Sequence, residues 1–131
     1  MTRNDLERMA GLNKQIRDLE RKKEELFERQ IRITQFLSDM PKGHTHYDKM
    51  AAYVAQLEEI EIEFADVIAE HSSLLIRYYR AVATLKERER EILKMKYEER
   101  KSWRRIASAL NYSESRAQGI HREALKKIQD F

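Results

Sequence analysis

The sequence contains no cysteine, one proline and three glycines in 131 residues. Without cysteine, a disulfide framework and a thiolate nucleophile are both excluded. Proline and glycine are the residues that most often interrupt helices, and 37% of the residues are charged. We therefore expect long amphipathic helices rather than a sheet-rich fold. The length suits one ordinary domain, or a small domain with an extended helical element.

Long apolar runs are also missing. No stretch approaches the roughly 18 consecutive apolar residues of a membrane span, and residues 1–10 lack the apolar core of a signal peptide. No Ser/His/Asp set, paired-carboxylate site or glycine-rich phosphate loop stands out, so we expect no enzyme, no catalytic residue and no cofactor. The prediction is a soluble cytoplasmic protein without membrane contacts.

Two polar clusters have competing interpretations. His44 and His46, with Asp48 nearby, have part of the spacing of a metal site. Because no further ligands follow at a fixed spacing, we interpret them as a polar turn and expect no metal. The acidic run over residues 58–63 is interpreted as a solvated helix face, with a docking surface for a basic partner as the alternative.

Positive charge is concentrated in the C-terminal third of the chain. Residues 1–85 contain 13 Lys and Arg against 15 Asp and Glu, a net charge of −2. Residues 86–131 contain 13 against 8, a net charge of +5. Such an asymmetry is the electrostatic footprint of a segment that binds a polyanion.

Two long helices are predicted before this basic segment. The first starts at the capping-box spacing from Asn4 to Glu7 and the second at that from Thr45 to Asp48, with a stop at Met40–Gly43 between them. Each carries apolar residues at alternating spacings of three and four, which is a heptad seam. The first seam is Met9, Leu12, Ile16, Leu19, Lys23, Leu26, Gln30, Ile33 and Leu37. The second is Met50, Tyr53, Leu57, Ile60, Phe64, Val67, His71, Leu74, Tyr78 and Ala81.

Matched helices of roughly 35 residues, or about 50 Å each, joined by a short linker predict an antiparallel hairpin over residues 1–83. Lys23 and Gln30 occupy seam positions, where polar residues help to fix register or partner number. The apolar stripes are wider than one partner helix needs. We therefore expect a homodimer, most simply a four-helix bundle; the alternative is a monomeric hairpin that packs on its own C-terminal domain.

A three-helix unit is predicted over residues 84–131. Its first helix follows a capping-box spacing from Thr84 to Glu87 and runs from Lys86 to about Tyr97. The charged residues 98–101 connect it to the next helix. The inward residues of the first helix are Leu85, Ile92, Leu93 and Tyr97.

Residues 102–129 have helix-turn-helix spacing. Ser102 is the expected N-cap of a helix from Trp103 to Leu110, Asn111 suits a left-handed turn position, and Ser113 caps the second helix. The fold class is thus all-α, with a long, coiled-coil-like antiparallel helical hairpin followed by a C-terminal three-helix helix-turn-helix domain. The inward residues of the motif are Ile106, Ala107, Leu110, Ala117, Ile120, Ala124, Leu125 and Ile128.

A longer pattern extends across this unit. It comprises Leu85, Arg88-Glu89-Arg90, Ile92-Leu93, Lys96-Tyr97, Ile106-Ala107, Leu110, Ser113, Ile120 and Ala124-Leu125-Lys126-Lys127. The pattern resembles region 4 of bacterial sigma factors, the domain that reads the −35 promoter element. The string SWRRIASALNYS followed by IHREALKKI, with Trp103 and His121, is more closely similar to the small late-gene regulators of phages and prophages of Gram-positive bacteria, the RinA- and ArpU-like group.

The start of the second helix of the motif departs from the family pattern. Sigma region 4 usually has arginines there, whereas this sequence has Glu114 and Ser115, with Gly119 one turn later. The consensus −35 sequence is therefore not expected as the target. No counterpart of the core-binding region 2 is found, so a complete sigma factor is not expected.

The outward side chains of the motif are candidate DNA contacts. In the major groove Gln pairs bidentately with adenine and Arg with guanine, so Gln118 and Arg122 are expected to read bases. The expected phosphate contacts are Arg104, Arg105, Arg116 and Lys126. The other candidates, near helix N-termini or on the outward face, are Lys101, Ser113, Ser115 and Gly119.

Two residues of the second helix allow more than one interpretation. Gly119 either permits close approach to DNA or is a tolerated defect that costs up to about 1 kcal/mol. His121 is interpreted as a packed or capping side chain rather than a ligand.

The leading hypothesis is a sequence-specific transcriptional regulator, an activator of phage or prophage late genes in the bacterial host cell. Its expected partners are double-stranded DNA, a second copy of the chain and host RNA polymerase. One alternative is a small terminase-like subunit that recognises viral DNA for packaging and forms a larger ring. The other is a protein-binding antagonist that occupies the polymerase in place of sigma region 4.

Overall fold

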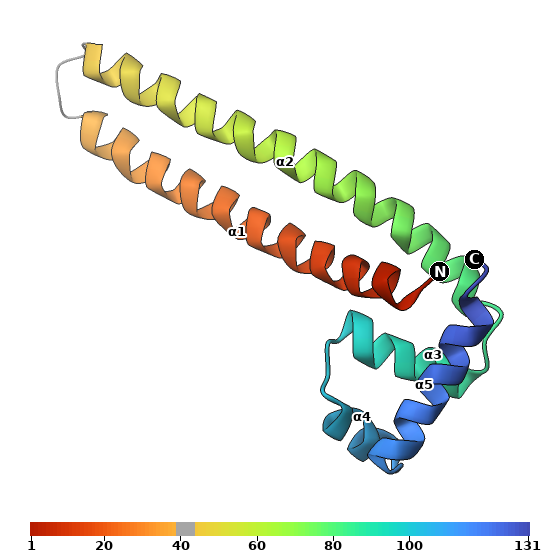
Figure 1. Ribbon diagram of the computed structural model, residues 1–131. Coiled ribbons are helices and arrows are strands. Elements are labelled where there is room, and N and C mark those ends of the chain that lie inside the picture. Colours follow the sequence, from red (N-terminus) through yellow and green to blue (C-terminus); the bar gives the residue numbers. More distant parts are fainter. Residues whose placement is uncertain (39–43) are drawn as a thin grey trace. The chain divides into compact units, whose positions relative to one another are not determined.

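The computed structural model describes residues 1–38 and 44–131, which contain helices and no strand (Figure 1). Two long helices come first, and three short helices follow with a π-helical segment, η1, among them. The predicted all-α class is confirmed. The elements are α1 (Arg3–Ser38), α2 (His44–Val82), α3 (Glu87–Leu93), η1 (Lys94–Glu98), α4 (Trp103–Leu110) and α5 (Glu114–Ile128).

Some of the predictions fall where no structure is described. The stop at Met40–Gly43 lies outside the described residues, as do the side chains of His44, Thr45 and His46. In the described part of the chain, no helix is both long enough and apolar enough to cross a membrane.

The chain divides into two compact units. The helix-turn-helix unit consists of Met1–Asn13 and Glu70–Phe131, and the hairpin unit consists of Lys14–Ala69. The three-helix module therefore shares its unit with the start of α1 and the end of α2. The predicted division into a hairpin domain (residues 1–83) and a DNA-binding domain (residues 84–131) is a different kind of division, and it stays a prediction.

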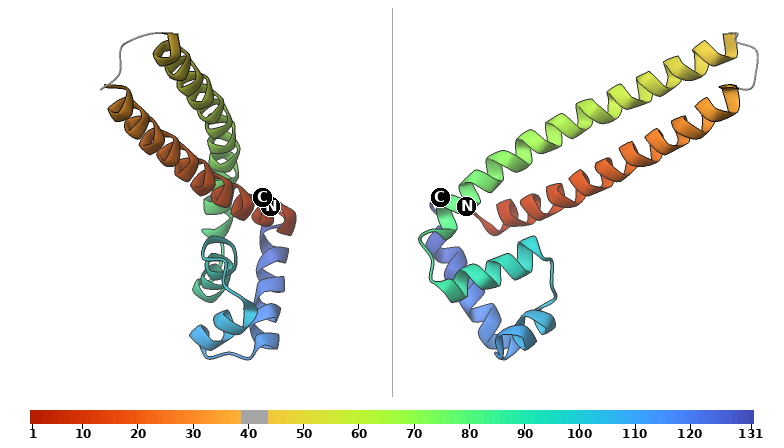
Figure 2. Two further views of the ribbon diagram at one scale, coloured as in Figure 1. Left: turned by 90° about the vertical axis from the view of Figure 1, so that its left-hand side faces the viewer. Right: turned by 180° about the vertical axis from the view of Figure 1, so that it is seen from behind.

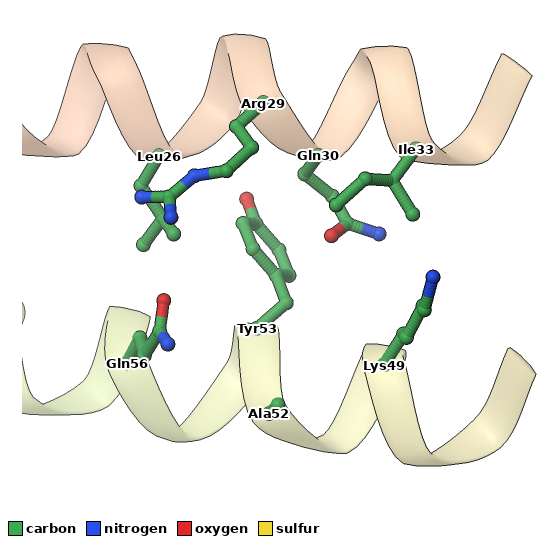
Figure 3. Close-up of a pocket in the computed structure, with 8 residues that line it drawn as sticks. All are labelled: Leu26, Arg29, Gln30, Ile33, Lys49, Ala52, Tyr53 and Gln56. Atoms are coloured by element: carbon green, nitrogen blue, oxygen red, sulfur yellow. The ribbon is translucent and has the colours of Figure 1, made fainter. Parts of the chain in front are cut away.

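In the hairpin unit, α1 and α2 run antiparallel. The Lys23 ammonium forms an ion pair with the Glu61 carboxylate, and the Gln30 amide nitrogen lies 3.1 Å from the Met50 sulfur. The residue later in α1 therefore contacts the residue earlier in α2, as an antiparallel pair requires. Figure 3 shows Tyr53 of α2 directing its hydroxyl toward α1. Both polar seam residues, Lys23 and Gln30, take part in contacts between the helices.

The two helices of the hairpin unit differ in burial. On α1 the seam residues Ile16, Leu19 and Leu26 are buried. The α2 seam residues of this unit all remain at least partly exposed: Met50, Tyr53, Leu57, Ile60, Phe64 and Val67. A single partner helix therefore leaves the apolar stripe of α2 incompletely covered.

The start of α1 corrects one predicted cap. Asp5 N–H donates to the Thr2 hydroxyl at 3.3 Å, and the Asp5 carboxylate accepts the Thr2 N–H at 2.9 Å. This reciprocal pair is a capping box with Thr2 as the N-cap, so the predicted box from Asn4 to Glu7 is wrong. The Thr2 N–H bond, with a smaller effect of Arg77 at 3.6 Å, lowers the pKa of Asp5.

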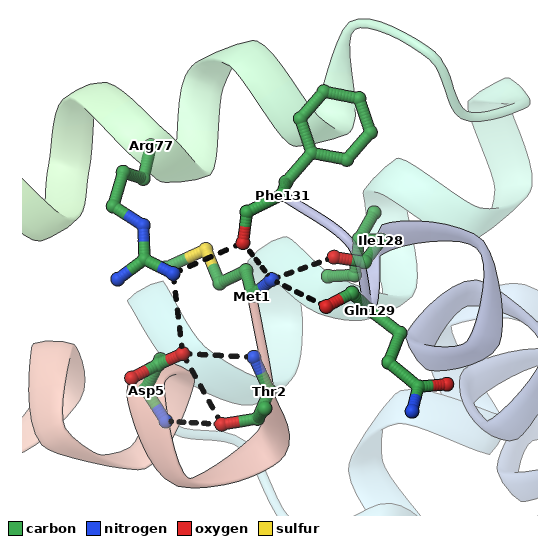
Figure 4. Close-up of polar contacts among 7 residues, drawn as sticks. All are labelled: Met1, Thr2, Asp5, Arg77, Ile128, Gln129 and Phe131. Atoms are coloured by element: carbon green, nitrogen blue, oxygen red, sulfur yellow. Dashed lines mark hydrogen bonds and ion pairs between the residues drawn. The ribbon is translucent and has the colours of Figure 1, made fainter.

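The Met1 ammonium lies at the C-terminal end of α5 (Figure 4). It donates to the carbonyls of Ile128 at 2.7 Å and Gln129 at 3.1 Å, and to that of Phe131. Arg77 also donates to the Phe131 carbonyl, at 3.0 Å. The last carbonyls of a helix carry partial negative charge, so both cations stabilise this end of α5. Burial, reinforced by Arg77, lowers the pKa of the Met1 amine.

The connection between α2 and α3 breaks near the predicted position, but a different contact holds it. α2 ends at Val82, and α3 begins at Glu87 without a side-chain cap. The Thr84 hydroxyl instead donates to the Ala81 carbonyl at 2.7 Å and closes the end of α2. The predicted Thr84 capping box is therefore wrong.

The helix expected to reach Tyr97 changes from α to π hydrogen bonding at Lys94. The Lys101 N–H donates to the Met95 carbonyl at 2.9 Å, and Arg100 takes a left-handed φ of 54° that ends the segment. This wide turn directs the chain into α4. The predicted inward residues of this stretch are all buried: Leu85, Ile92, Leu93 and Tyr97.

Candidate nucleic-acid interface

Three local features form the helix-turn-helix as predicted. The Ser102 hydroxyl accepts the Arg105 N–H at 3.3 Å at the start of α4, and the Ser113 hydroxyl accepts the Arg116 N–H at 3.1 Å at the start of α5. Between the helices, Asn111 adopts the left-handed conformation, with φ 57° and ψ 39°. The two caps and the turn determine where α4 ends and α5 begins.

A small core lies beneath the motif. Ile92 of α3, Ile106 of α4 and Ala117 of α5 are fully buried and in contact. Because Ala117 is small, α4 can approach α5 closely at this point. Figure 2 shows α3, α4 and α5 from two further directions, and both α3 and α4 pack against α5. Two neighbouring helices therefore determine the position of α5.

His121 links α5 to η1 and α4. Its Nε2 lies 2.7 Å from the Tyr97 hydroxyl, and its ring makes a T-shaped contact with the Trp103 ring, with 5.0 Å between centroids. The side chain is 5% exposed. Burial, together with positive charges of which Arg3 is the foremost, lowers the pKa of His121 to about 4. The ring is therefore neutral at pH 7 and packed, which is the first of the two roles, packed or capping, in the sequence-based interpretation.

A charge pair missed by the sequence analysis joins α3 to α5. The Lys127 ammonium lies 2.5 Å from Oε1 of Glu89, which is 4% exposed. Oε2 of Glu89 is buried and has no hydrogen-bond partner within the described residues. The signal was present in the sequence, because Glu89 precedes the inward residue Ile92 by three positions and so lies on the same face of α3.

Five of the candidate contacts on α5 share one helix face, because each lies three or four residues from another of them; Arg116, in the first turn of α5, is not among these five. Among the described residues, no ion pair engages Arg104, Arg105, Arg116, Arg122 or Lys126, and all five are exposed. The face of α5 that carries these candidate contacts comprises Ser115, Gln118, Gly119, Arg122 and Lys126.

Two other candidates already have intramolecular partners. Lys101 lies 3.0 Å from the Glu99 carboxylate, and the Ser113 hydroxyl is used in the cap of α5. Part of the positive charge of Lys101 is therefore neutralised. The DNA contacts expected of both residues stay predictions.

The fold adds Arg88 to the basic surface. Its guanidinium lies 5.7 Å from the centroid of the Tyr112 ring, and that of Arg116 lies 5.1 Å from the same centroid. Tyr112, in the turn between α4 and α5, thus holds two cations from different helices beside the motif. The spacing of 24 positions between Arg88 and Tyr112 provides no sequence signal for this contact.

Gly119 has no conformational reason to be glycine. Neither a positive φ nor a close neighbour is found, and an added Cβ would meet only the Arg122 guanidinium, at 3.8 Å. That distance is ordinary van der Waals contact. The fold therefore tolerates alanine here, and any need for glycine must come from a molecule that approaches α5.

A comparison with known families matches the C-terminal part of the chain. Residues 81–130 match the family model for sigma-70, region 4. No curated protein and no solved structure matches the chain. Together with the geometry of α4 and α5, the match indicates a role in DNA binding and transcription.

Proposed function

We propose that this protein is a sequence-specific regulator of transcription that places α5 in the major groove of double-stranded DNA. The observation that carries the proposal is the outward face of α5, where Gln118 and Arg122 lie one helical turn apart. These side chains have the hydrogen-bonding geometry for adenine and guanine edges, respectively. The match of residues 81–130 to sigma-70, region 4 supports the same assignment.

The exposed cations around that face would neutralise phosphates. Arg104 and Arg105 lie in the first turn of α4, Arg116 in the first turn of α5, and Lys126 in its last turn. Because they have no carboxylate partner among the described residues, their charge is available to the DNA backbone. Binding should then release counterions and weaken steeply with salt.

The biological setting is a more specific part of the proposal. The similarity to the RinA- and ArpU-like group supports an activator of phage or prophage late genes, and the similarity to sigma region 4 supports action with host RNA polymerase. The protein would act in the cytoplasm of the bacterial host without catalysing a reaction. The alternatives are a DNA-packaging subunit and a sigma-like antagonist.

Binding-site selection tests the proposal directly. The full chain is equilibrated with a duplex library of random sequence, and recovered duplexes are measured by fluorescence anisotropy at several salt concentrations. We expect one recurring motif and a linear fall of log K with log salt concentration. If no duplex is bound at low salt, DNA binding is wrong and the antagonist alternative gains support.

Run-off transcription tests the role in activation. Host RNA polymerase transcribes DNA that flanks the gene, with and without the protein. We expect at least one transcript to increase, and to lose that increase when Gln118→Ala and Arg122→Ala are combined. If every transcript is unchanged, the activator role is contradicted while DNA binding can still stand.

A further inference from the structure

The hairpin unit exposes more apolar surface than its two helices can bury. Phe27 is 56% exposed, Ile31 41%, Met50 40% and Val54 46%. We call these four residues the apolar strip. An aromatic side chain has roughly 200 Å² of surface, and the aliphatic side chains of the strip have somewhat less. Multiplied by the exposed fractions, these areas leave on the order of 300 Å² of apolar surface in solvent.

The members of the strip share one face of the hairpin unit. Phe27 lines a groove of about 650 Å³ together with Leu57 and Phe64. On α1 the strip continues one turn later at Ile31. On α2 it lies three and seven residues before Leu57, which keeps it on the same side of that helix. The strip therefore extends the apolar floor of the groove.

We propose that a second copy of this chain covers the apolar strip, so that two hairpin units pack face to face as four helices. The strip contains no charged residue, and a two-fold axis brings identical apolar surfaces together. A standard interface takes about 800 Å² from each partner, of which the strip alone supplies over a third. Packing a second layer would also cover the half-exposed seam of α2.

This inference goes beyond the proposed function, because it would hold for a chain that binds no DNA. If both proposals are right, a dimer would present two copies of α5 to one DNA site. Affinity and half-site spacing would then depend on the hairpin unit as well as on the residues that contact bases.

The charges around the groove distinguish a second copy from a basic partner. Glu20 and Glu24 line its rim, while Lys23 is already paired with Glu61. Two copies bring like charges near each other, so salt should screen repulsion and strengthen the dimer. A basic helix would instead be attracted by these carboxylates and released by salt. The uncharged strip beyond the rim favours the second copy.

Two matched substitutions on α1 test the interface in the full chain. Phe27→Asp places a charge in the strip. Phe36→Asp is the control, since Phe36 is 64% exposed and lies nine residues away, two and a half turns, on the opposite side of α1. Val54→Asp repeats the disruption from α2. All three positions are exposed, and circular dichroism verifies that helicity is retained.

Analytical ultracentrifugation measures the result. We expect a mass of about twice the 15.8 kDa of the chain for wild type and for Phe36→Asp. Phe27→Asp and Val54→Asp should each weaken dimerisation at least tenfold, and salt should tighten the wild-type dimer. A wild-type monomer, equal effects of Phe27→Asp and Phe36→Asp, or weakening by salt would each overturn the proposal.

Two further outcomes separate this proposal from the others. A ring of many copies would contradict the two-fold interface and support the packaging alternative. A dimer that binds no duplex would contradict the proposed function alone. Conversely, a monomer that binds duplex DNA would contradict the interface and leave DNA recognition intact.

Discussion

Tyr97 and His121 share a hydrogen bond of 2.7 Å inside the helix-turn-helix unit, between the phenolic oxygen and Nε2. Both side chains are buried, and burial is the main cause that raises the pKa of Tyr97 and lowers that of His121. The pair joins η1 to the middle of α5. The neutral state of His121 is therefore coupled to the packing of the helix proposed to read DNA.

Stability should consequently fall as the pH drops from about 6.5 to about 4. The pKa of His121 is about 4 in the folded chain and 6.5 when unperturbed, so the unfolded chain binds the additional proton across this interval. The free energy of unfolding then decreases as pH falls, by at most about 3–4 kcal/mol, at about 1.4 kcal/mol per pKa unit.

Urea titrations between pH 7 and pH 4 measure this loss. His121→Phe keeps an aromatic ring but cannot titrate, so its stability should depend less on pH over the same interval. Carboxylates titrate in both proteins, and the difference between the two curves isolates the histidine. Parallel curves for wild type and His121→Phe would contradict the assignment.

Gly119→Ala should separate folding from DNA binding. The substitution removes a helix-interior glycine where the fold has room, so it should stabilise the protein by up to about 1 kcal/mol. If α5 approaches the duplex closely at this point, the added methyl group should weaken binding. Urea denaturation and anisotropy measure the two effects. Ser108→Ala, on the exposed surface of α4, is the control that should leave DNA affinity unchanged.

Gln118→Ala should cost about 1–3 kcal/mol of binding free energy and relax preference at one base pair. The reason is the loss of a bidentate contact to adenine, while phosphate contacts persist. Binding-site selection with the variant measures the change. Recovery of the wild-type motif without change would remove Gln118 from the base-reading residues.

Arg104→Ala should weaken binding to all duplexes alike and reduce the salt dependence. Loss of one phosphate contact lowers the slope of log K against log salt concentration by about 1. Arg32→Ala, an exposed arginine of α1 in the hairpin unit, makes the same change in net charge without altering the basic surface of the motif. Equal slopes for the two variants would show that Arg104 makes no specific contact with phosphate.

Lys127→Met should destabilise the protein by about 1–3 kcal/mol, because it leaves the buried carboxylate of Glu89 without its partner. Adding Glu89→Leu should recover part of this loss, since no unpaired charge then remains inside. A double-mutant cycle by urea denaturation measures the coupling. Additive losses would mean that the two residues act independently.

The helix-turn-helix could be predicted closely because its determinants are local. Ser102, Asn111 and Ser113 act on backbone groups within four residues, so sequence spacing is enough to locate them. At Asn4 and Thr84, spacing predicted a capping box that does not form. In each case the chain offered more than one local hydrogen bond, and spacing alone did not distinguish the cap that forms from the one that does not.

Sequence by itself determined the helical class, the heptad seams, the two caps of the motif and the outward face of α5, because each follows from periodicity or from contacts within a turn. Tertiary structure alone decided that Arg88 joins Arg116 on Tyr112, that Lys127 reaches Glu89, and that Met1 lies at the end of α5. Arg88 and Tyr112 are 24 positions apart, Glu89 and Lys127 are 38 apart, and Met1 and Ile128 are 127 apart. No local pattern links them, since their proximity depends on how α3, α5 and the start of α1 pack together.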